Sequence, residues 1–379
     1  MKHGVRILTV VACIAIACPM AAAQDTLTRF DIPGEGPLQI VTDVVVTSPG
    51  AQVHRHVLAP GSDPAVAKAI DRASGKPLAT RVEGGALIVS FGRTLNDKAE
   101  QRLGIEEQVP RAGFLKPQGP GWAFSSRVGP GRAVIVLPPG FALVRSSVLA
   151  QVASEGERVK LGIVNATDGA LTVQVDMRPG AAGSVPIAPG GFRAEDDRNI
   201  VYWLGDPESH RIDLALELRI TQPGQAHAYS VLNKGDNITN PRTLDVDRGV
   251  DLPTRIVSGT EAAALGELTF PAEAAVFVAD LGDKVAAGGS ARVRLYQTAT
   301  EPVGYRLLPT GEIRWDRFVG RLRTRAVLPE GWVLTSVDQP ALVSVDERGR
   351  VVLDFVHAGA DSPKLVLTAR KAPASRTGT

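Results

Sequence analysis

The sequence has few of the residue types that support covalent or cofactor chemistry. Its two cysteines, Cys13 and Cys18, lie within the first 23 residues, so a chain cleaved after Ala23 has no disulfide, thiolate nucleophile or thiolate metal site. Aromatic residues make up 5% of the chain, which argues against a stacking platform. The common nucleophile, zinc-protease, phosphate-loop and dinucleotide motifs are all missing. We therefore expect no cofactor, and the residues identify no catalytic set.

The first 23 residues have the pattern of an export signal. Lys2 and Arg6 form a basic start, residues 7–17 are apolar, and small residues lead up to Ala23. We expect an exported protein, periplasmic or extracellular; the alternative is a lipoprotein attached through Cys18. The apolar stretch is shorter than the ~20 residues that span a bilayer. No later stretch is apolar enough either, so we expect no transmembrane segment.

The charge pattern excludes one class of partner. The chain has 42 basic and 40 acidic residues, and removing Lys2 and Arg6 with the signal leaves 40 of each. No basic run remains that would gather phosphate groups, so we expect no binding to nucleic acid.

The chain contains an internal duplication. Residues 38–85 align without a gap on residues 212–259, with 12 identities in 48 positions, where average composition gives roughly 3 by chance. A second block, residues 136–140, aligns on residues 327–331. The offset grows from 174 to 191 between the blocks, so the second copy carries 17 additional residues.

Alternating apolar residues predict strands throughout both copies. In residues 212–220 the apolar side chains recur with period two, which predicts one buried and one wetted face. Nine Pro-Gly dipeptides punctuate the chain, as type II turns between short strands require. Helical periodicity is confined to two stretches of about two turns, residues 64–71 and 95–102. The expected fold is all-β, with tandem antiparallel β-sandwiches of immunoglobulin-like type.

These observations divide the chain into five parts. We predict a signal peptide at 1–23, a first β repeat at 24–178, a linker at 179–199, a second repeat at 200–370 and a disordered tail at 371–379. Each repeat can fold as one sandwich or as two small ones.

His54 and His56 are the candidate metal ligands. Alternate residues of a strand point to the same face, so two imidazoles could share a metal ion. No acidic residue stands at ligand spacing nearby, and the second copy has Ala228 and Ser230 at these positions. The competing interpretation is a pair of histidines that face solvent.

Two further patterns need an interpretation. Aspartates alternate from Asp245 to Asp251, as in a calcium loop, but without its distal glutamate. An Asx-type turn explains them better. Among the tryptophans, Trp203 is expected in the core, and Trp315 is a candidate for an exposed ring.

One segment resembles a known family. Residues 71–107 contain the rhythm Leu-x-Val-x-Phe, charged turn, Leu-x-Ile at residues 87–91 and 103–105. This resembles the non-catalytic amino-terminal β-sandwich of M1-type metallo-aminopeptidases. That family's catalytic helix with its zinc ligands has no counterpart in this sequence, so no catalytic residue carries over. The whole chain resembles exported bacterial proteins of unknown function that are built from duplicated β-domains.

Two functions follow as hypotheses. The first is a non-catalytic binding or structural module of the cell envelope, which contacts a protein or another envelope component through sandwich edges or end loops. The alternative is a hydrolase with a site between the repeats, where His54 and His56 would be the first candidates.

Overall fold

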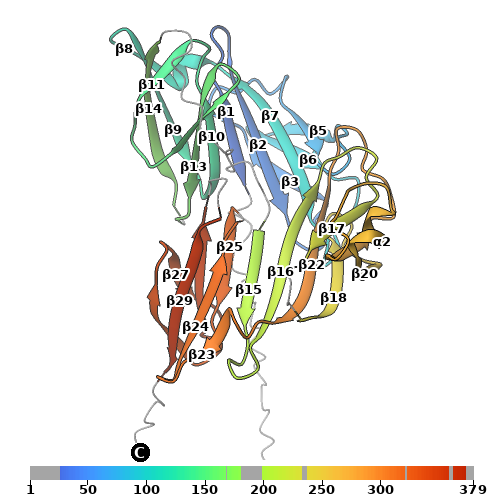
Figure 1. Cartoon of the computed structure of the whole chain (residues 1–379). Coiled ribbons are helices and arrows are strands. Elements are labelled where there is room, and N and C mark those ends of the chain that lie inside the picture. Colours follow the sequence, from blue (N-terminus) through green and yellow to red (C-terminus); the bar gives the residue numbers. More distant parts are fainter. Residues whose placement is uncertain are drawn as a thin grey trace, which may run out of the picture.

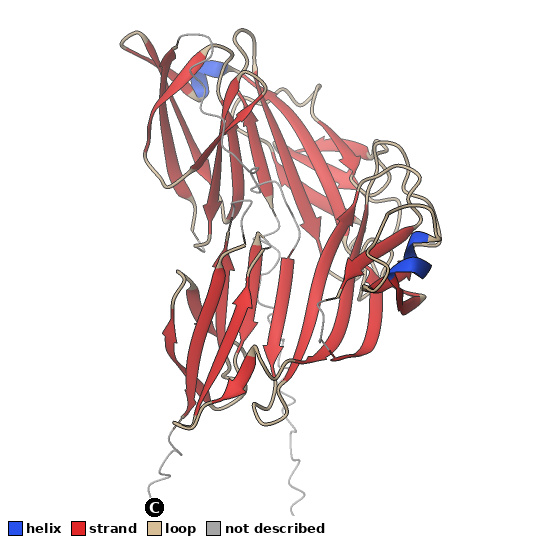
Figure 2. Ribbon diagram, viewed as in Figure 1, coloured by secondary structure: helices blue, strands red, loops and turns tan. Residues whose placement is uncertain are grey.

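The computed structural model describes residues 26–167, 169–180, 199–232, 237–320, 322–357 and 362–372. The predicted signal peptide, most of the linker and the end of the tail lie outside these residues. Within them the chain is nearly all strand, and its helices are η1 (Arg111–Gly113) and α2 (Gly259–Ala263). Figures 1 and 2 show two β-rich halves, one above the other. We call residues 26–180 repeat one and residues 199–372 repeat two.

Repeat one consists of one large sheet and two small ones. In spatial order, the large sheet contains β12 (Gln151–Glu155), β13 (Arg158–Asn165), β10 (Gly131–Val136), β1 (Leu27–Asp31), β2 (Leu38–Val46), β7 (Gln101–Val109) and β4 (Lys68–Asp71). The three-stranded sheet contains β3 (Val53–Val57), β6 (Ala86–Ser90) and β5 (Ala79–Glu83). The four-stranded sheet contains β11 (Phe141–Ser146), β14 (Leu171–Pro179), β9 (Gly121–Val128) and β8 (Leu115–Gln118).

Repeat two has the same three sheets in the same order. Its large sheet contains β19 (Val250–Leu252), β18 (Asn237–Asp245), β22 (Ala291–Thr300), β16 (Arg211–Ile220), β15 (Asn199–Leu204), β25 (Arg323–Val327), β28 (Val351–Val356) and β27 (Leu342–Val345). The small sheets are β17 (His227–Val231), β21 (Ala275–Asp280) and β20 (Thr254–Ser258), and β26 (Trp332–Val337), β29 (Lys364–Lys371), β24 (Glu312–Phe318) and β23 (Tyr305–Leu307).

The prediction of tandem β-sandwiches from an internal duplication is confirmed, with one addition. Each repeat contains one parallel pair within its large sheet, β1 with β10 and β15 with β25. The other strand pairs are antiparallel in both repeats. The Pro-Gly turns behave as predicted at Gly50 and Gly224, where φ is +80° and +83°, a region that glycine enters without strain.

The additional residues of repeat two lie almost entirely in one place. The offset between equivalent positions is 174 up to Ser258 and 190 from Ala275 onward, so 16 of the 17 residues fall in residues 259–274. This segment contains α2, whose Ala262 packs with Val276 and Val278 against the outer face of the three-stranded sheet. A capping box between Ser258 and the third helical residue begins the helix.

The two stretches with helical periodicity are not helical. Residues 68–71 of the first form β4, and the second ends in β7, which pairs with β4. Strand pairing therefore overrides the weak local preference. No helix of the described residues is both long and apolar enough to cross a membrane.

The two repeats contact each other through equivalent elements. The turn at residues 71–75 meets Ser290 of repeat two, whose hydroxyl donates to a carbonyl of that turn at 3.0 Å. The turn at residues 245–249 meets Glu100 of repeat one, whose N–H donates to a carbonyl of that second turn at 2.6 Å. The two turns correspond in the duplication, and so do positions 100 and 290. The contact therefore has the exchanged pattern of a symmetric dimer.

Buried ion pairs reinforce this contact. Arg102 and Arg292 stand at equivalent positions of β7 and β22. Arg102 donates Nε and Nη2 to the two carboxylate oxygens of Asp247, each at 2.7 Å. Arg292 pairs with Glu100 at 2.9 Å and with Glu217 at 2.8 Å. Because an unpartnered charge is costly in a buried site, these pairs hold the repeats in one relative position.

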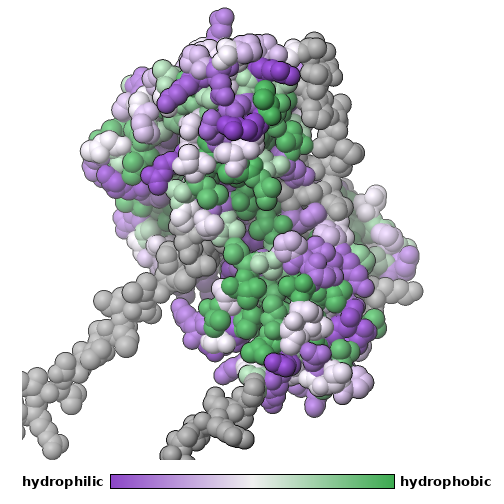
Figure 3. All heavy atoms as spheres, turned by 90° about the vertical axis from the view of Figure 1, so that its left-hand side faces the viewer, coloured by the Kyte–Doolittle hydropathy of each residue, from purple (hydrophilic) through white to green (hydrophobic). Residues whose placement is uncertain are grey.

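The outer edges of the two large sheets differ in polarity. In repeat one, Glu155 at the end of edge strand β12 pairs with Arg29 and Lys160. In repeat two, edge strand β27 exposes Val343 and Val345, which are 53% and 65% accessible. Figure 3 shows hydrophobic residues gathered on this side of the molecule, over both halves. Such an edge strand is a ready surface for strand pairing.

Candidate functional site

A groove runs between the two small sheets of repeat one. Its floor is the inner face of β1 and β2, and its walls are the end of β3 on one side and β9 on the other. The cavity measures about 600 Å³, inside the range of roughly 300–1,000 Å³ of ligand pockets. Every residue that lines it belongs to repeat one: Thr28, Phe30, Ile40, Thr42, His56, Val57, Leu58, Ala59, Pro60, Glu107, Gly113, Phe114, Ser125, Ser126, Arg127 and Thr172.

A histidine–glutamate pair closes one wall of the groove. His56 Nε2 lies 2.8 Å from Glu107 Oε1, and the Ala59 N–H donates to Glu107 Oε2 at 2.8 Å. The Glu107 side chain is 2% exposed. Burial acts to raise the pKa of Glu107, but the hydrogen bonds from His56 and Ala59 outweigh it and lower that pKa. The carboxylate therefore remains charged and holds His56 against the floor.

The two candidate histidines do share a face, but that face points inward. On β3 they stand opposite Leu87 and Val89 of the core, and their ring centroids are 6.4 Å apart. The expectation that they face solvent is therefore wrong. Burial, and then the neighbouring His56, lower the pKa of His54. Among the described residues, no group of three histidine, cysteine, aspartate or glutamate side chains could hold a metal.

Sequence reasoning missed Glu107 because it lies 51 residues from His56 along the chain. Strand β7 brings it close by pairing with β2. One signal was available in the sequence. Glu107 follows Leu103 and Ile105 at alternate positions, which places a carboxylate on the apolar face of a strand.

Repeat two has the same space, but it is largely filled. Strand registers align its lining with that of the groove, and the remaining cavity is about 180 Å³. Ser230 replaces His56, and Gln297 replaces Glu107. Two floor threonines, Thr28 and Thr42, are replaced by larger apolar residues, Ile200 and Leu216 respectively.

An arginine completes the filling of repeat two. Arg317 occupies the position of Ser126 and donates Nε to the Tyr202 hydroxyl at 3.1 Å. Its guanidinium lies over the Tyr202 ring, 4.8 Å from the centroid, and it pairs with Glu301. Burial opposes the charge, but Tyr202 and Glu301 raise the pKa of Arg317 above its usual value. This cation is therefore held in place as part of the wall.

The hydrophobic cores reflect the same difference. Repeat one has two separate clusters, one under each small sheet, built around Phe124 and around Leu87. Repeat two has one cluster that reaches under both of its small sheets and contains Trp315, Phe277 and Leu216. The groove of repeat one is thus the region where the common core is interrupted.

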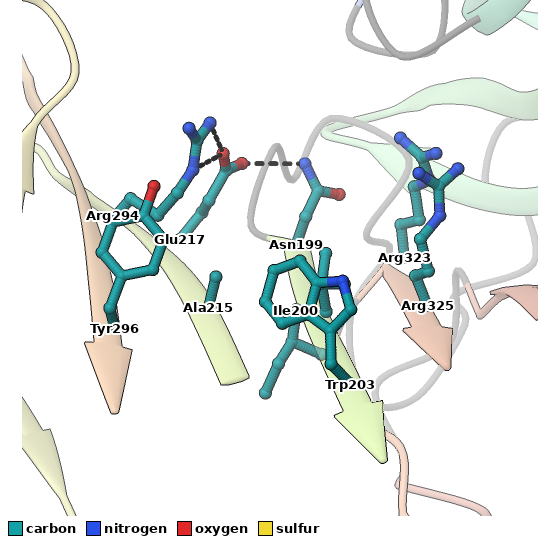
Figure 4. A pocket seen from close by; sticks show the side chains of 10 residues that line it. Asn199, Ile200, Trp203, Ala215, Glu217, Arg294, Tyr296, Arg323 and Arg325 are labelled. Atoms are coloured by element: carbon teal, nitrogen blue, oxygen red, sulfur yellow. Dashed lines mark hydrogen bonds and ion pairs between the residues drawn. The ribbon is translucent and has the colours of Figure 1, made fainter. Parts of the chain in front are cut away.

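A second cavity lies on the opposite face of the large sheet of repeat two. It measures about 420 Å³ and is flanked by Trp203 and Tyr296 (Figure 4). Its polar groups engage one another, since Asn199 donates to Glu217 at 3.0 Å and Glu217 pairs with Arg294. We regard this cavity as less suited to a ligand than the groove, because its charges are already neutralised.

The tryptophan expectations are reversed. Trp203 lines this second cavity and is partly exposed. Trp315 is 0% exposed and packs edge-on to Tyr202 at 5.1 Å. It stands at the position of Phe124 in repeat one, a fully buried core residue. Strand alternation therefore dictates its burial.

The alternating aspartates form a turn. Asp245 Oδ1 accepts from the N–H groups of Asp247 and Arg248, each at 3.0 Å. This is the Asx-type geometry that the sequence favoured. Asp247 is engaged by Arg102 in the contact between repeats.

Comparison with known proteins identifies no family. No family model and no curated protein matches the chain. Among solved structures, an aminopeptidase N family protein from Idiomarina loihiensis is 11% identical, with a TM-score of 0.28, over 45% of this chain and 29% of its own. An M1 zinc metallopeptidase from Deinococcus radiodurans is 12% identical, with a TM-score of 0.28, over 48% of this chain and 44% of its own.

A bacterial surface protein gives a weaker match. The serine-rich repeat adhesion glycoprotein from Streptococcus agalactiae is 9% identical, with a TM-score of 0.21, over 78% of this chain and 92% of its own. The chain spans less than half the length of the two peptidases. At such low scores these likenesses carry no argument about activity.

Proposed function

We propose that this chain is a non-catalytic binding module of the cell envelope, exported to the periplasm or beyond, and that the groove of repeat one is its binding surface. One observation carries the proposal. The repeats keep the same three sheets, yet repeat one keeps this space open and lines it with polar groups, whereas repeat two fills it. A surface that diverges on a retained scaffold is where a function acquired by one copy belongs.

Capture with a matched variant tests this function. The mature chain is used as bait in extract of its native envelope, with crosslinkers attached on either side of the groove. The control is Ser126→Arg, which places in repeat one the arginine that fills repeat two. We expect a partner that the wild type captures and the variant loses. A partner captured equally by both would place the binding surface elsewhere.

Export is tested separately. The signal at 1–23 predicts a processed protein in the periplasmic or extracellular fraction of the cells that make it. Replacement of Cys18 by serine leaves processing intact if a signal peptidase cleaves after Ala23. The same change blocks maturation if the lipoprotein alternative holds.

One observation favours the hydrolase alternative, within repeat one rather than between the repeats. The His56–Glu107 pair lines a groove that Ser125 and Ser126 also line, and a base oriented by a carboxylate is one half of a nucleophilic site. Double alanine substitution at His54 and His56 then abolishes turnover of ester or peptide substrates. Turnover that survives the substitution removes these residues from the hypothesis.

A further inference from the structure

The β3 edge that borders the groove presents unpaired backbone groups. In the β3–β6 ladder, the Leu58 N–H donates to β6, and Gln52 accepts from it. Hydrogen-bonded pairs alternate along an antiparallel ladder, so His54 and His56 also bond to β6. The N–H and C=O groups of Arg55 and Val57 therefore point away from β6, toward the groove. In the described structure no other strand pairs with β3 on this side.

The opposite wall has a free edge as well. Strand β8 pairs with β9 only as far as Phe124. The Ser125 N–H then donates to the Phe114 carbonyl at 2.8 Å, which shows that Ser125 directs its backbone to this side. By the same alternation, Arg127 directs its N–H and C=O to the groove. Two strand edges thus border one gap in the layer that covers the large sheet.

The side chains around the gap define what would fit there. The floor between the edges contains Phe30 and Ile40, which are buried, beside the hydroxyls of Thr28 and Thr42. On the outer side, Arg127 lies on the exposed face of β9.

Arg55 lies on the corresponding outer face of β3, opposite Ile88. The described residues give neither Arg55 nor Arg127 an ion pair. A segment between the two edges thus meets apolar surface below and a guanidinium on each side above.

We infer that the groove binds an extended peptide segment as an additional strand between β3 and β9. Its inward side chains are apolar and its outward ones acidic, because alternate residues of a strand face the floor and the two arginines. The inserted strand would join the three-stranded and four-stranded sheets into one continuous layer. This inference rests on the proposed binding function and specifies the ligand class.

A phage-displayed library of linear peptides, randomised at every position, is the probe. We expect the mature wild-type protein to select peptides that alternate apolar and acidic residues. Ser126→Arg should weaken their binding by roughly tenfold or more, because the new side chain occupies the gap. Hydrogen exchange at the amides of Arg55, Val57 and Arg127 should slow when a selected peptide binds.

A second variant is independent of the packing inside the groove. Arg55→Glu with Arg127→Glu changes only exposed side chains, so the fold is retained. This double variant should lose the acidic peptides and select peptides that carry lysine at the outward positions.

The results separate the inference from the function on which it rests. Selected peptides that bind Ser126→Arg as tightly as wild type, or that leave the three amides unprotected, overturn the added strand while a binding function remains. A library that yields no peptide also overturns it. Failure of the envelope capture in addition would overturn the binding function itself.

Discussion

The space between the small sheets is open in repeat one and filled in repeat two, although the strands around it follow the same order. The difference depends on few positions. A serine against Arg317, and two floor threonines against Ile200 and Leu216, separate a groove of about 600 Å³ from a remnant of about 180 Å³. A duplicated scaffold therefore preserves backbone pairing while side chains decide whether the core is continuous.

The comparison extends to the charges on the other face of each large sheet. Glu217 of repeat two is buried between Arg292 and Arg294. Its counterpart in repeat one, Asp43, pairs with the partly exposed Arg72. The same position thus carries a buried ionic contact between the repeats in one copy and a partly exposed pair in the other.

The largest expected effect comes from breaking this ionic contact. Glu217→Gln should lower the free energy of unfolding at pH 7 by about 3–5 kcal/mol, because it leaves buried arginines without their partner. The control Asp43→Asn should cost less than ~1 kcal/mol. Denaturant titration of both variants measures the difference. Equal costs would mean that the two positions do not differ in the way described.

The pH dependence sharpens the same point. Burial opposes ionisation of Glu217, but Arg292 and Arg294 lower its pKa from 4.5 to about 2. A lowered folded pKa contributes stability above the unfolded value. Wild type should therefore lose about 3 kcal/mol as the pH falls from 4.5 toward 2. Glu217→Gln should show less of this loss in titrations over the same range.

The next effect tests the continuity of the cores. Leu216→Thr removes a buried side chain from repeat two and should cost about 2–4 kcal/mol. The reciprocal Thr42→Leu adds apolar volume where the groove has room. It should leave stability unchanged or raise it, and it should reduce peptide binding. A large loss from Thr42→Leu would show that the floor of repeat one is already closely packed.

A smaller effect is expected from opening repeat two. Arg317→Ser removes the cation over Tyr202 and the partner of Glu301, at a cost of about 2 kcal/mol. Its cavity should then approach that of repeat one in a crystal structure. Arg317→Lys, which keeps the charge but not the planar contact, should fall between the two. An unchanged cavity would mean that other residues close this space.

The smallest effect on stability concerns the edge strands. Val345→Lys on β27 should change the free energy of unfolding by no more than ~0.5 kcal/mol. It should nevertheless reduce self-association at high concentration, because a charge on an exposed edge opposes strand pairing. Ser154→Lys, at the equivalent position of β12, should leave association unchanged. Analytical ultracentrifugation distinguishes the two variants.

Strand positions could be predicted because alternation and turn residues are local signals. The bounds of β2 and β21, Leu38–Val46 and Ala275–Asp280, agree with the apolar pattern alone. Residues 64–71 failed because two turns of helical periodicity are weaker than pairing with a distant strand. The duplication supplied the architecture, since two related copies predict two related folds.

The site was less accessible to sequence reasoning. His56 was identified, but Glu107 was not, because only the sheet register brings them to 2.8 Å. The groove itself depends on a missing side chain at Ser126, and an absence of bulk has no sequence motif. What pointed to it was the difference between copies, since the substitutions cluster only after the strands are aligned in space.

The exchanged contact between the repeats has a consequence for valency. In a dimer of identical chains, any substitution occurs twice, so two grooves open or close together. Covalent fusion keeps the contact at a high effective concentration while each half changes separately. One chain can then present a single receptive groove and a closed counterpart. Such a molecule engages one partner segment at a time and does not crosslink two.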